Sequence, residues 1–294
     1  MSQPPPSSAE TLIFDRNGIV PHHFRSSRGV PADQIISIFG LDRLNASASA
    51  QFGRDDLRFA VDNDLHHPAR YVIVDLRQEA HGFINGAPVS WYAPKNWLNR
   101  GKSKDWITQD EAKRLAELSQ QTTALVRHVL DKDLSGSIGE SDSVKVKVRD
   151  VQSEEELVTK DLGLEYVRFP VADHCPPPVD EVEAFLQFVR DFDRRREPWW
   201  PHFHCHGGDG RTSSFLVMYD MLRNARKVGF VDLLRRQQVR GSIDLFDLGT
   251  GWKNPLARER LRFLRCFFDY VREGGYHHGK RLGHWYHPRD PDAE

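Results

Sequence analysis

Residues 201–215, PHFHCHGGDGRTSSF, bring one cysteine, three histidines, three glycines and an arginine into one short segment. Two kinds of site use such residues. A zinc site would take the alternating histidines, which share one face of a strand, and a His-Cys pair elsewhere in the chain. Its ligands would be His202, His204, His206, His174 and Cys175. The other possibility is a cradle for a phosphate group, with Cys205 as the nucleophile that attacks it.

The phosphate cradle accounts for more of the segment. A predicted strand ends at Cys205, glycines follow, and a predicted helix starts near Thr212, so successive backbone N–H groups can point into one concavity. That positive potential favours a thiolate at its centre. Arg211 can hold two phosphoryl oxygens at once, which lysine does less well, and the Thr212 hydroxyl could donate to the thiolate. The loop residues expected to surround the phosphate are His206, Gly207, Gly208, Asp209 and Gly210.

A phosphatase of this kind also needs an acid, because attack on a phosphate monoester expels an oxyanion that must be protonated. Asp173, in the Pro-rich segment ADHCPPP ahead of the nucleophile, is the candidate. We expect Cys205 to form a cysteinyl-phosphate while Asp173 protonates the leaving oxygen, after which Asp173 acts as base toward a water. Since this needs an ionised Cys205 and a protonated Asp173 together, we expect a bell-shaped, mildly acidic pH–rate profile.

The composition limits what kind of protein carries this segment. Its 294 residues suit one large domain, or one domain with a small insert, and its three cysteines do not make a disulfide framework. The formal net charge of −1 gives no general positive field for nucleic acid. No apolar run approaches membrane-spanning length, and the start MSQPPPSSAE does not resemble a signal peptide. If a leader had been removed the protein could be secreted or periplasmic; otherwise we expect a cytoplasmic protein or a translocated effector.

The elements that position these residues can be predicted from hydrophobic periodicity. Strands are predicted over residues 71–76, 144–148, 164–171 and 199–205. The second of these, VKVKV, alternates strictly, as an edge or half-buried strand does. Helices are predicted from the capping-box patterns at Thr108 and Ser153, the latter ending near Gly163. Further helices are predicted after the prolines at 176–178 and over residues 212–224, 228–239 and 256–272.

Strands that alternate with helices indicate an α/β fold with a mainly parallel central sheet flanked by helices. The stretch near 131–152 is polar and then alternating, which suggests a small β-rich insert in that fold. We assign residues 1–15 to a disordered tail, 16–285 to the catalytic domain with its insert, and 286–294 to a second tail.

The residues from Cys205 to Thr212 resemble the Cys-x5-Arg-Ser/Thr signature of cysteine-dependent protein tyrosine phosphatases, and His204 matches the histidine that usually precedes the nucleophile there. Other segments are similar to one bacterial branch of that superfamily, the tyrosine-phosphatase-like inositol polyphosphatases or cysteine phytases. These segments are HHFRSSR at 22–28, VDLRQEAHGFINGAPVSWY at 74–92 and YVRFPVADHCPP at 166–177. The similarity runs from about residue 20 to about residue 275.

This resemblance implies a phosphatase core that carries a small inserted partial β-barrel and that works without a metal or other cofactor. It places the general acid in the Asp-His segment, at Asp173. It also implies that His81 and His174 lie near the substrate. Asp75 and Arg77, at the end of a predicted strand, could contact substrate or form a structural ion pair.

Phosphotyrosine, phosphoinositides and soluble inositol polyphosphates all suit this chemistry. A highly phosphorylated inositol needs several cations outside the loop. The candidates are Arg25, Arg28, Arg77, Lys95, Arg168 and Lys253. Lipid-acting relatives typically carry lysines inside the loop, whereas this loop has His206 and Asp209, and the sequence has no polybasic tail. An acidic Asp209 beside a polyanion is unfavourable unless it points away or bonds the loop itself.

We therefore expect an inositol polyphosphate phosphatase, with phytate as the best single substrate. We expect no nucleic acid, membrane insertion or obligate protein partner. The alternative enzyme is a protein tyrosine phosphatase, for example one delivered to a host as an effector. The alternative from another class is a phosphate-binding module without turnover, but such a module would need neither the nucleophile nor the acid.

Overall fold

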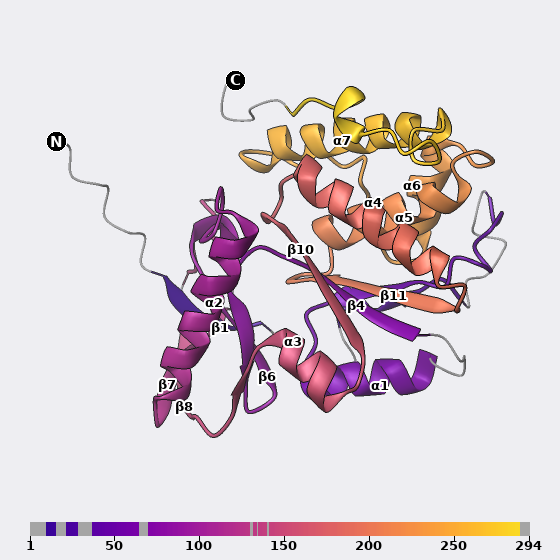
Figure 1. Cartoon of the computed structure of the whole chain (residues 1–294). Coiled ribbons are helices and arrows are strands. Elements are labelled where there is room, and N and C mark those ends of the chain that lie inside the picture. Colours follow the sequence, from indigo (N-terminus) through magenta and orange to yellow (C-terminus); the bar gives the residue numbers. More distant parts are fainter. Residues whose placement is uncertain are drawn as a thin grey trace.

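The computed structural model describes residues 10–15, 22–28, 37–64, 70–129, 132–133, 135–139 and 141–288. A five-stranded sheet lies between two layers of helices, and a six-stranded sheet lies beside it (Figure 1). Within the described residues, no helix has both the length and the apolar character needed to cross a membrane. Cys175, Cys205 and Cys266 are all free thiols.

The five-stranded sheet carries the nucleophile. Its strand order is β10 (Glu165–Val171), β4 (Arg70–Arg77), β11 (Trp199–Cys205), β3 (Ser47–Ala50) and β2 (Arg25–Ser26). The first four are parallel, and the short β2 pairs antiparallel with β3, so the predicted α/β class with a mainly parallel sheet is confirmed. β11 lies in the middle and is buried along its whole length, because helices cover both faces of such a sheet.

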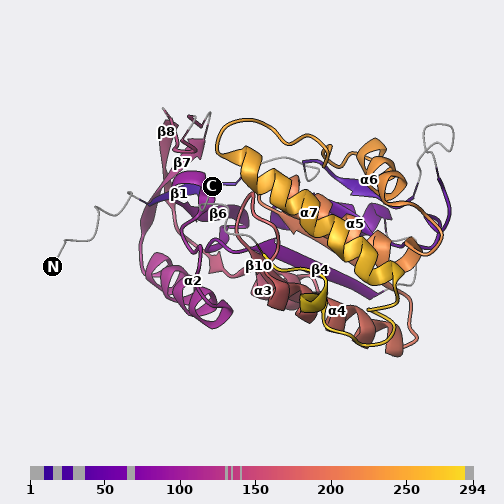
Figure 2. The ribbon, with the colours of Figure 1, turned by 90° about the horizontal axis from the view of Figure 1, so that it is seen from above.

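Helices cover the two faces of this sheet unequally (Figures 1 and 2). One face carries α4 (Val179–Arg194), α5 (Gly210–Asn224), α6 (Phe230–Val239) and α7 (Lys253–Arg272), and the main core lies beneath them. Phe185, Phe203 and Phe215 meet there, with ring centroids 5.2 to 6.1 Å apart where they contact. The other face carries α1 (Arg54–Asp64), α3 (Glu154–Glu156) and the π-helical η3 (Leu157–Asp161) over a smaller core.

The six-stranded sheet is built from segments that are far apart in the chain. Its order is β8 (Ser141–Lys147), β7 (Thr123–Val129), β1 (Thr11–Phe14), β6 (Ala87–Tyr92), β5 (His81–Ile84) and β9 (Val151–Gln152). The stretch near 131–152 therefore supplies β8 and β9, and β8 lies at the edge, as its alternating sequence predicts. Leu118 of α2 (Lys104–Ser119) packs with Val89 and Val126 in the core of this sheet.

The predicted tails differ from the structure at both ends. Thr11–Phe14, assigned to a disordered tail, forms β1 and is hydrogen-bonded between β6 and β7. Tyr286, assigned to the second tail, is 1% exposed, and its ring packs edge-on against Phe263. Both segments are too short for periodicity to reveal them, and neighbours distant in the sequence bury them. The rest of the first tail lies outside the described residues, apart from Glu10 and Asp15.

The two capping-box patterns had different outcomes. At Ser153 the prediction is confirmed: its hydroxyl accepts from the backbone N–H of Glu156, whose carboxylate accepts in return from the Ser153 backbone. At Thr108 the prediction is wrong, because α2 begins a turn earlier, after a cap at Ser103. The Thr108 hydroxyl lies inside the helix and donates to the carbonyl of Lys104.

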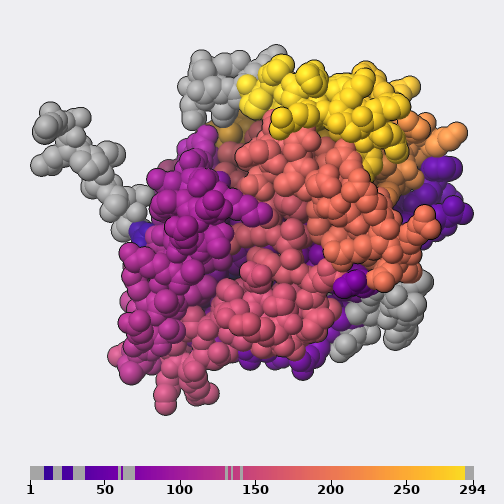
Figure 3. Space-filling view, viewed as in Figure 1, coloured from indigo at the N-terminus to yellow at the C-terminus, as the bar shows by residue number. Residues whose placement is uncertain are grey.

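The six-stranded sheet and its helix are packed directly against the rest of the molecule. In the space-filling view the magenta residues of α2 meet the pink and orange surface of β10 and α4 (Figure 3). Lys104, at the start of α2, donates to the carbonyl of Arg168 in β10 at 2.6 Å. This bond ties α2 to β10, the edge strand of the five-stranded sheet.

Candidate active site

The loop between β11 and α5 turns three consecutive carbonyls outward, each onto a donor from another segment. The pairs are His206 O with Gln51 N at 3.2 Å, Gly207 O with His23 Nδ1 at 3.1 Å and Gly208 O with Arg25 Nη2 at 2.9 Å. In a trans peptide the next N–H points opposite to the carbonyl. The N–H groups of Gly207, Gly208 and Asp209 therefore face the inside of the loop, which is the arrangement that binds an anion.

Gly208 is the glycine that this loop requires. Its φ is +75°, and a Cβ there would lie 2.5 Å from the backbone nitrogen of Ala50 and 2.8 Å from the carbonyl carbon of Ser49. Both atoms belong to β3, so the loop can approach the sheet edge this closely only without a side chain. A Cβ on Gly207 would meet nothing nearer than the Asp209 carboxylate, at 3.3 Å.

The candidate nucleophile lies at the bottom of the loop. Cys205 is the last residue of β11 and is 2% exposed. Thr212, in the first turn of α5, is fully buried, and its hydroxyl has no hydrogen-bond partner among the described residues. The same holds for the buried Nε of Arg211. Two buried donors are thus available beside the loop, where a phosphoryl group would need them.

Arg211 is fixed by a residue that the sequence did not single out. Its Nη1 and Nη2 donate to the two carboxylate oxygens of Glu79, at 2.7 and 3.1 Å, and Nη1 also donates to the carbonyl of Val171. Burial lowers the pKa of Arg211, but Asp173, Glu79 and Cys205 raise it well above its usual value overall. A planar guanidinium held on one edge keeps its orientation while the remaining donors serve a ligand.

Asp173 lies at the mouth of the loop beside Arg211. Its Oδ1 is 3.3 Å from Arg211 Nη2, and its Oδ2 accepts from Asn96 Nδ2 at 3.3 Å. Trp97 Nε1 donates to its backbone carbonyl at 2.8 Å. Burial raises the pKa of Asp173, but Arg211 and His174 lower it to about 2 overall. The free protein therefore holds Asp173 as a carboxylate at mildly acidic pH.

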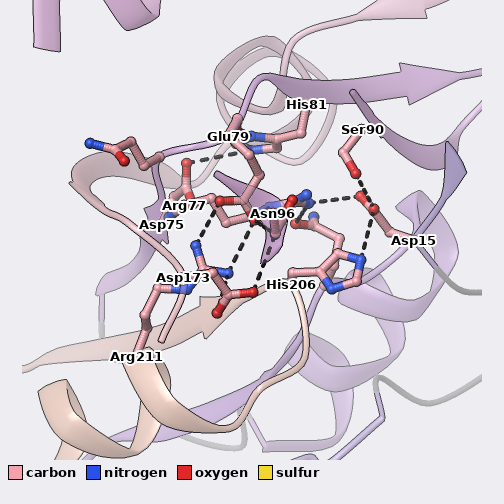
Figure 4. A network of polar contacts seen from close by, with 12 residues as sticks. Asp15, Asp75, Arg77, Glu79, His81, Ser90, Asn96, Asp173, His206 and Arg211 are labelled. Carbon is pink, nitrogen blue, oxygen red and sulfur yellow. Dashed lines mark hydrogen bonds and ion pairs between the residues drawn. The ribbon is translucent and has the colours of Figure 1, made fainter. Parts of the chain in front are cut away.

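Behind the loop lies a fully buried array of alternating charge (Figure 4). Arg77 donates to Asp15 at 2.7 Å and, through Nε, to Glu79 at 3.0 Å, and both carboxylates have 0% exposed side chains. Arg77 was predicted either to contact substrate or to form a structural ion pair with Asp75; it lies in buried ion pairs, with Asp15 and Glu79. Sequence alone shows which residues carry charge but not which charges neutralise one another.

A second buried charge cluster holds other predicted contacts. His81 Nε2 lies 3.2 Å from Glu154 and 3.4 Å from Asp75, and both His81 and Asp75 are essentially inaccessible. Arg168 bonds both carboxylate oxygens of Glu111 at 2.8 Å. His81, Asp75 and Arg168 were expected near the substrate, but here they join the sheet to α2 and α3. A buried ion-pair cluster and a substrate-binding site use the same residue types. Only the tertiary packing shows which of the two these residues form.

The alternating histidines have separate partners. His202 lies between the hydroxyls of Ser47 and Ser49, each at 2.9 Å. His204 is fully buried, with Nε2 2.7 Å from Glu154. His206 points to Asp15, at 3.2 Å. Across the described ranges, no three His, Cys, Asp or Glu side chains gather as a metal ion would require.

Two further predicted residues support the loop from outside. Asp209 is half exposed and pairs with His23 at 2.9 Å, so its charge is bonded at the outer side of the loop. Arg25, expected to contact substrate, is 5% exposed and donates to Gly208 O, Ser213 and Ser242. Its guanidinium holds the loop in place from behind rather than facing outward.

Cations and aromatic rings gather near Asp173. Lys95 Nζ contacts the rings of Trp97 and Trp252, 4.6 and 4.8 Å from their centroids, in the corner where the two rings meet edge-on. The His174 ring meets Trp252 edge-on at 4.9 Å, and the exposed Lys253 follows Trp252 in the chain. Lys132 Nζ lies 4.5 Å from the centroid of Tyr92. We call Lys95, Lys132 and Lys253 the rim lysines; Lys132 and the two tryptophans were not foreseen.

Arg28 does not belong to this group. Its guanidinium lies over the ring of Trp200, 4.7 Å from the centroid, and near the side chain of Asn45. Trp200 is at the start of β11, the end of the strand opposite to Cys205. Arg28 was a candidate cation, and this position differs from that prediction.

The chain is similar in sequence to a known protein family and to a known effector protein. The family model PTP-like phytase, described by inositol hexakisphosphate, matches residues 74–223. Effector protein hopD2 of Pseudomonas syringae pv. tomato is 31% identical over 204 residues, which are 68% of this chain and 42% of that protein.

Two solved structures are similar over almost the whole chain. The PTP-like myo-inositol phosphatase from Mitsuokella multacida, solved with myo-inositol-(1,3,4,5)-tetrakisphosphate, has a TM-score of 0.83 and 31% identity. The match covers 98% of this chain and 50% of that one. A PTP-like phytase from Bdellovibrio bacteriovorus has a TM-score of 0.73 and 29% identity, covering 97% of both chains. The chain thus spans half or less of hopD2 and the Mitsuokella protein.

Proposed function

The chain belongs to the PTP-like phytase family, and from this membership we propose that it hydrolyses phosphomonoesters of myo-inositol polyphosphates through a cysteinyl-phosphate on Cys205. Phytate is the substrate that we propose first. The observation that carries the proposal is the meeting of three groups at one loop. Cys205 lies at its base, Arg211 lies beside it, and the carboxylate of Asp173 is 3.3 Å from that guanidinium.

In the first step a phosphoryl group would bind to the inward N–H groups of the loop and to Arg211. Its oxygens would accept from Gly207, Gly208 and Asp209 N–H, and the thiolate of Cys205 would attack phosphorus in line with the leaving oxygen. The sulfur–phosphorus bond forms as the phosphorus–oxygen bond breaks. The leaving alkoxide takes a proton from Asp173.

The low pKa of Asp173 in the free protein determines how that proton arrives. A carboxylate with a pKa of about 2 carries almost no proton at mildly acidic pH. A phosphate monoester has a second pKa near 6, so at such pH it carries one proton itself. A bound phosphate also partners Arg211 and adds negative charge beside Asp173. Both effects favour transfer of the substrate's proton to Asp173, from which it passes to the leaving oxygen.

In the second step water would attack the cysteinyl-phosphate. Asp173, now ionised, would take the proton of that water, and the sulfur–phosphorus bond would break to release inorganic phosphate. The Thr212 hydroxyl is available to donate to the departing thiolate. Arg211, held by Glu79, would keep its position through both steps, so the charge on phosphorus meets the same donors in each transition state.

The rim lysines favour a substrate with several phosphates. Lys95, Lys132 and Lys253 lie around Asp173 on three different segments, so a ring carrying one phosphate in the loop could bring others to them. A single phosphotyrosine would leave these lysines without a phosphate partner. The Mitsuokella structure was solved with an inositol tetrakisphosphate, which supports the same substrate class for this chain.

A protein tyrosine phosphatase is the second candidate, because hopD2 is named an effector protein and shares 31% identity with this chain. The test is phosphate release by wild type and Cys205→Ser, offered phytate and a phosphotyrosine peptide at about pH 5 with a chelator present. We expect faster release from phytate and none from the variant. Faster release from the peptide would move the function to protein dephosphorylation. Phytate binding without release by wild type would identify a binding module.

A further inference from the structure

One carboxylate beneath the phosphate loop has no part in the chemistry above. Asp15 follows β1, and its side chain is 0% exposed. Its Oδ2 accepts from Arg77 Nη1 at 2.7 Å, and its Oδ1 accepts from the Ser90 hydroxyl at 2.5 Å. The same Oδ1 lies 3.2 Å from His206 Nε2 (Figure 4). Burial raises the pKa of Asp15, but Arg77 and His206 lower it overall, so it is ionised.

The contact with His206 connects Asp15 to the phosphate loop. His206 is the residue directly after Cys205, and 17% of its side chain is exposed. Its Nε2 lies 3.2 Å from Oδ1 of the buried Asp15 carboxylate, so the imidazole ring is oriented toward that group, although the pair does not have hydrogen-bond geometry. The backbone of His206 is held as well, because its carbonyl accepts from Gln51 N. Arg77 Nη1 donates both to Asp15 and to Gln51 Oε1, at 2.7 Å each, so one guanidinium holds both supports of His206.

The same guanidinium reaches the other end of the loop. Arg77 Nε donates to Glu79, which in turn holds both terminal nitrogens of Arg211. An unbroken row of contacts therefore runs from His206 through Asp15, Arg77 and Glu79 to Arg211. Its two ends are His206, the first residue after the nucleophile, and Arg211, the second residue of α5. The spacing of the loop ends depends on a carboxylate supplied from the six-stranded sheet.

We propose that Asp15 is a positioning residue of the phosphate loop, which acts through His206 and Arg77 to hold the ring of N–H donors in register with Cys205. This inference rests on the proposed phosphatase function. A purely structural role, joining the two sheets, would need only the pairs with Arg77 and Ser90. The contact with His206 is the feature that a structural role does not require.

The consequence should appear in the chemical step. Asp15→Asn keeps the size of the side chain but removes the charge that Arg77 and His206 share. The loop donors would then be displaced by a fraction of an ångström, and misplacements of about 1 Å can lower a rate about 10²-fold. We expect kcat to fall about 10- to 100-fold, and KM to change by less than about 3-fold, because the rim lysines still hold the substrate.

The test compares Asp15→Asn, His206→Gln and the double variant, with Asp150→Asn as the matched control. Asp150 is also a carboxylate that ties the six-stranded sheet to the other half of the molecule, through Arg54 at 2.9 Å, but it is partly exposed and contacts no residue of the loop. We expect the double variant to be no slower than the slower single variant, as two members of one contact should be. We expect Asp150→Asn to retain the wild-type kcat.

Two results would overturn the proposal: a wild-type kcat in folded Asp15→Asn, or losses in the two single variants that multiply in the double. If Asp15→Asn does not fold, His206→Gln alone tests the proposal, because it leaves Asp15 paired with Arg77 and Ser90. A wild-type kcat in His206→Gln would then contradict the proposal. Calorimetric binding of inorganic phosphate keeps this test separate from the proposed function. If wild type binds phosphate but hydrolyses no ester, weakened phosphate binding in Asp15→Asn supports the positioning role and unchanged binding refutes it.

Discussion

Asp173 is ionised in the free protein because Arg211 and His174 outweigh its burial, although its proposed role is to donate a proton. The single proton needed for catalysis is shared between Asp173 and the substrate phosphate. It is present below the second pKa of the ester, near 6, and a surplus proton on Asp173 appears only near pH 2. We therefore expect wild-type kcat/KM to be level between about pH 3 and 5 and to fall above about pH 6.

Asp173→Asn tests that assignment directly. The variant keeps the size of the side chain and one acceptor oxygen, but its NH2 group cannot accept as the second carboxylate oxygen does, and it cannot carry the proton. We expect kcat on phytate to fall about 10²- to 10⁴-fold, the usual worth of a general acid. The loss should be much smaller on p-nitrophenyl phosphate, whose leaving group needs little protonation. Equal losses on both esters would indicate a structural role for Asp173.

The rim lysines can be tested one at a time. Lys132→Ala or Lys253→Ala removes one exposed cation, which is worth up to about 1 kcal/mol to a bound phosphate. We expect KM for phytate to rise about 3- to 5-fold and kinetics on p-nitrophenyl phosphate to stay unchanged. Lys160→Ala, on the far segment η3 and paired with Glu156, is the control. Unchanged KM for phytate in both rim variants would contradict a polyphosphate substrate.

At this scale the sequence identified the residues that act within one segment and missed those that act across segments. Cys205, Arg211 and Thr212 share a loop because the spacing of strand, glycines and helix leaves them no other arrangement. Glu79 and Asp15 reach Arg211 and His206 only through the tertiary fold. No spacing rule connects residues so far apart in the sequence. The residue type also does not show whether a carboxylate is buried or exposed.

Among the elements, the β11–loop–α5 unit depends on how closely Gly208 approaches β3. Gly208→Ala would place a methyl group 2.5 Å from a backbone nitrogen and would strain a residue whose φ is +75°. We expect loss of activity by more than about 10²-fold, with the fold retained in circular dichroism. Gly207→Ala meets nothing closer than 3.3 Å and should stay within about 10-fold of wild type. Equal activity of the two variants would contradict this account of the loop.

The turn that carries Asp173 and His174 is held by a neighbouring element rather than by its own sequence. Lys95 and Asn96, in the short helix η2 (Pro94–Asn96), and His174 all have positive φ, between 62° and 67°. Such strain persists where the surroundings over-determine it, and here Trp97 and Asn96 both bond Asp173. Secondary-structure patterns gave no sign of this contact. They did predict β4, β8, β10, β11 and most of the helices, but not α1 or the strands β1, β2, β3, β5, β6 and β7. The start of α2 was misplaced because its cap at Ser103 lacks the Glu three residues later that marks a capping box.

For the whole molecule, the buried cluster around His81 predicts how stability depends on pH. Burial and Arg77 lower the pKa of His81, but Asp75 and Glu111 raise it to about 10, from 6.5. Its contribution is complete below pH 6.5 and is lost as pH rises toward 10. Burial raises the pKa of Glu154, but His204 lowers it to about 2, from 4.5, so its contribution is lost as pH falls from 4.5 toward 2.

We therefore expect the urea midpoint of unfolding to be highest between about pH 4.5 and 6.5 and to decline on both sides. His81→Gln should flatten the alkaline decline of the urea midpoint. At pH values below 6.5 the variant should have a lower midpoint than wild type, and the decline at acidic pH should persist. A wild-type midpoint that is constant from pH 6.5 to 10 would show that His81 is not protonated in the native state.

The sequence predicted the architecture of one half of the molecule better than the other. The parallel sheet follows from strands that alternate with helices, and β4, β10 and β11 were recognised from their apolar residues, whereas the small residues of β3 gave no such signal. The six-stranded sheet joins β1, from the start of the chain, to β6 and β7, and four residues of strand do not stand out in sequence. A β-rich segment near 131–152 could be predicted from the sequence, but the other strands that join it in this sheet could not.

The rings around Lys95 have a practical consequence for observing this protein. Trp97 and Trp252 are two of seven tryptophans. Both rings contact Lys95, and the Trp97 indole N–H also donates to the carbonyl of Asp173. A polyanion that draws Lys95 away from the two indoles alters the local field and the packing of both fluorophores. Titration of Cys205→Ser with phytate should thus change the intrinsic emission intensity, and Trp252→Phe should remove much of that signal. The protein then reports occupancy of its own site optically, without turnover or an added dye.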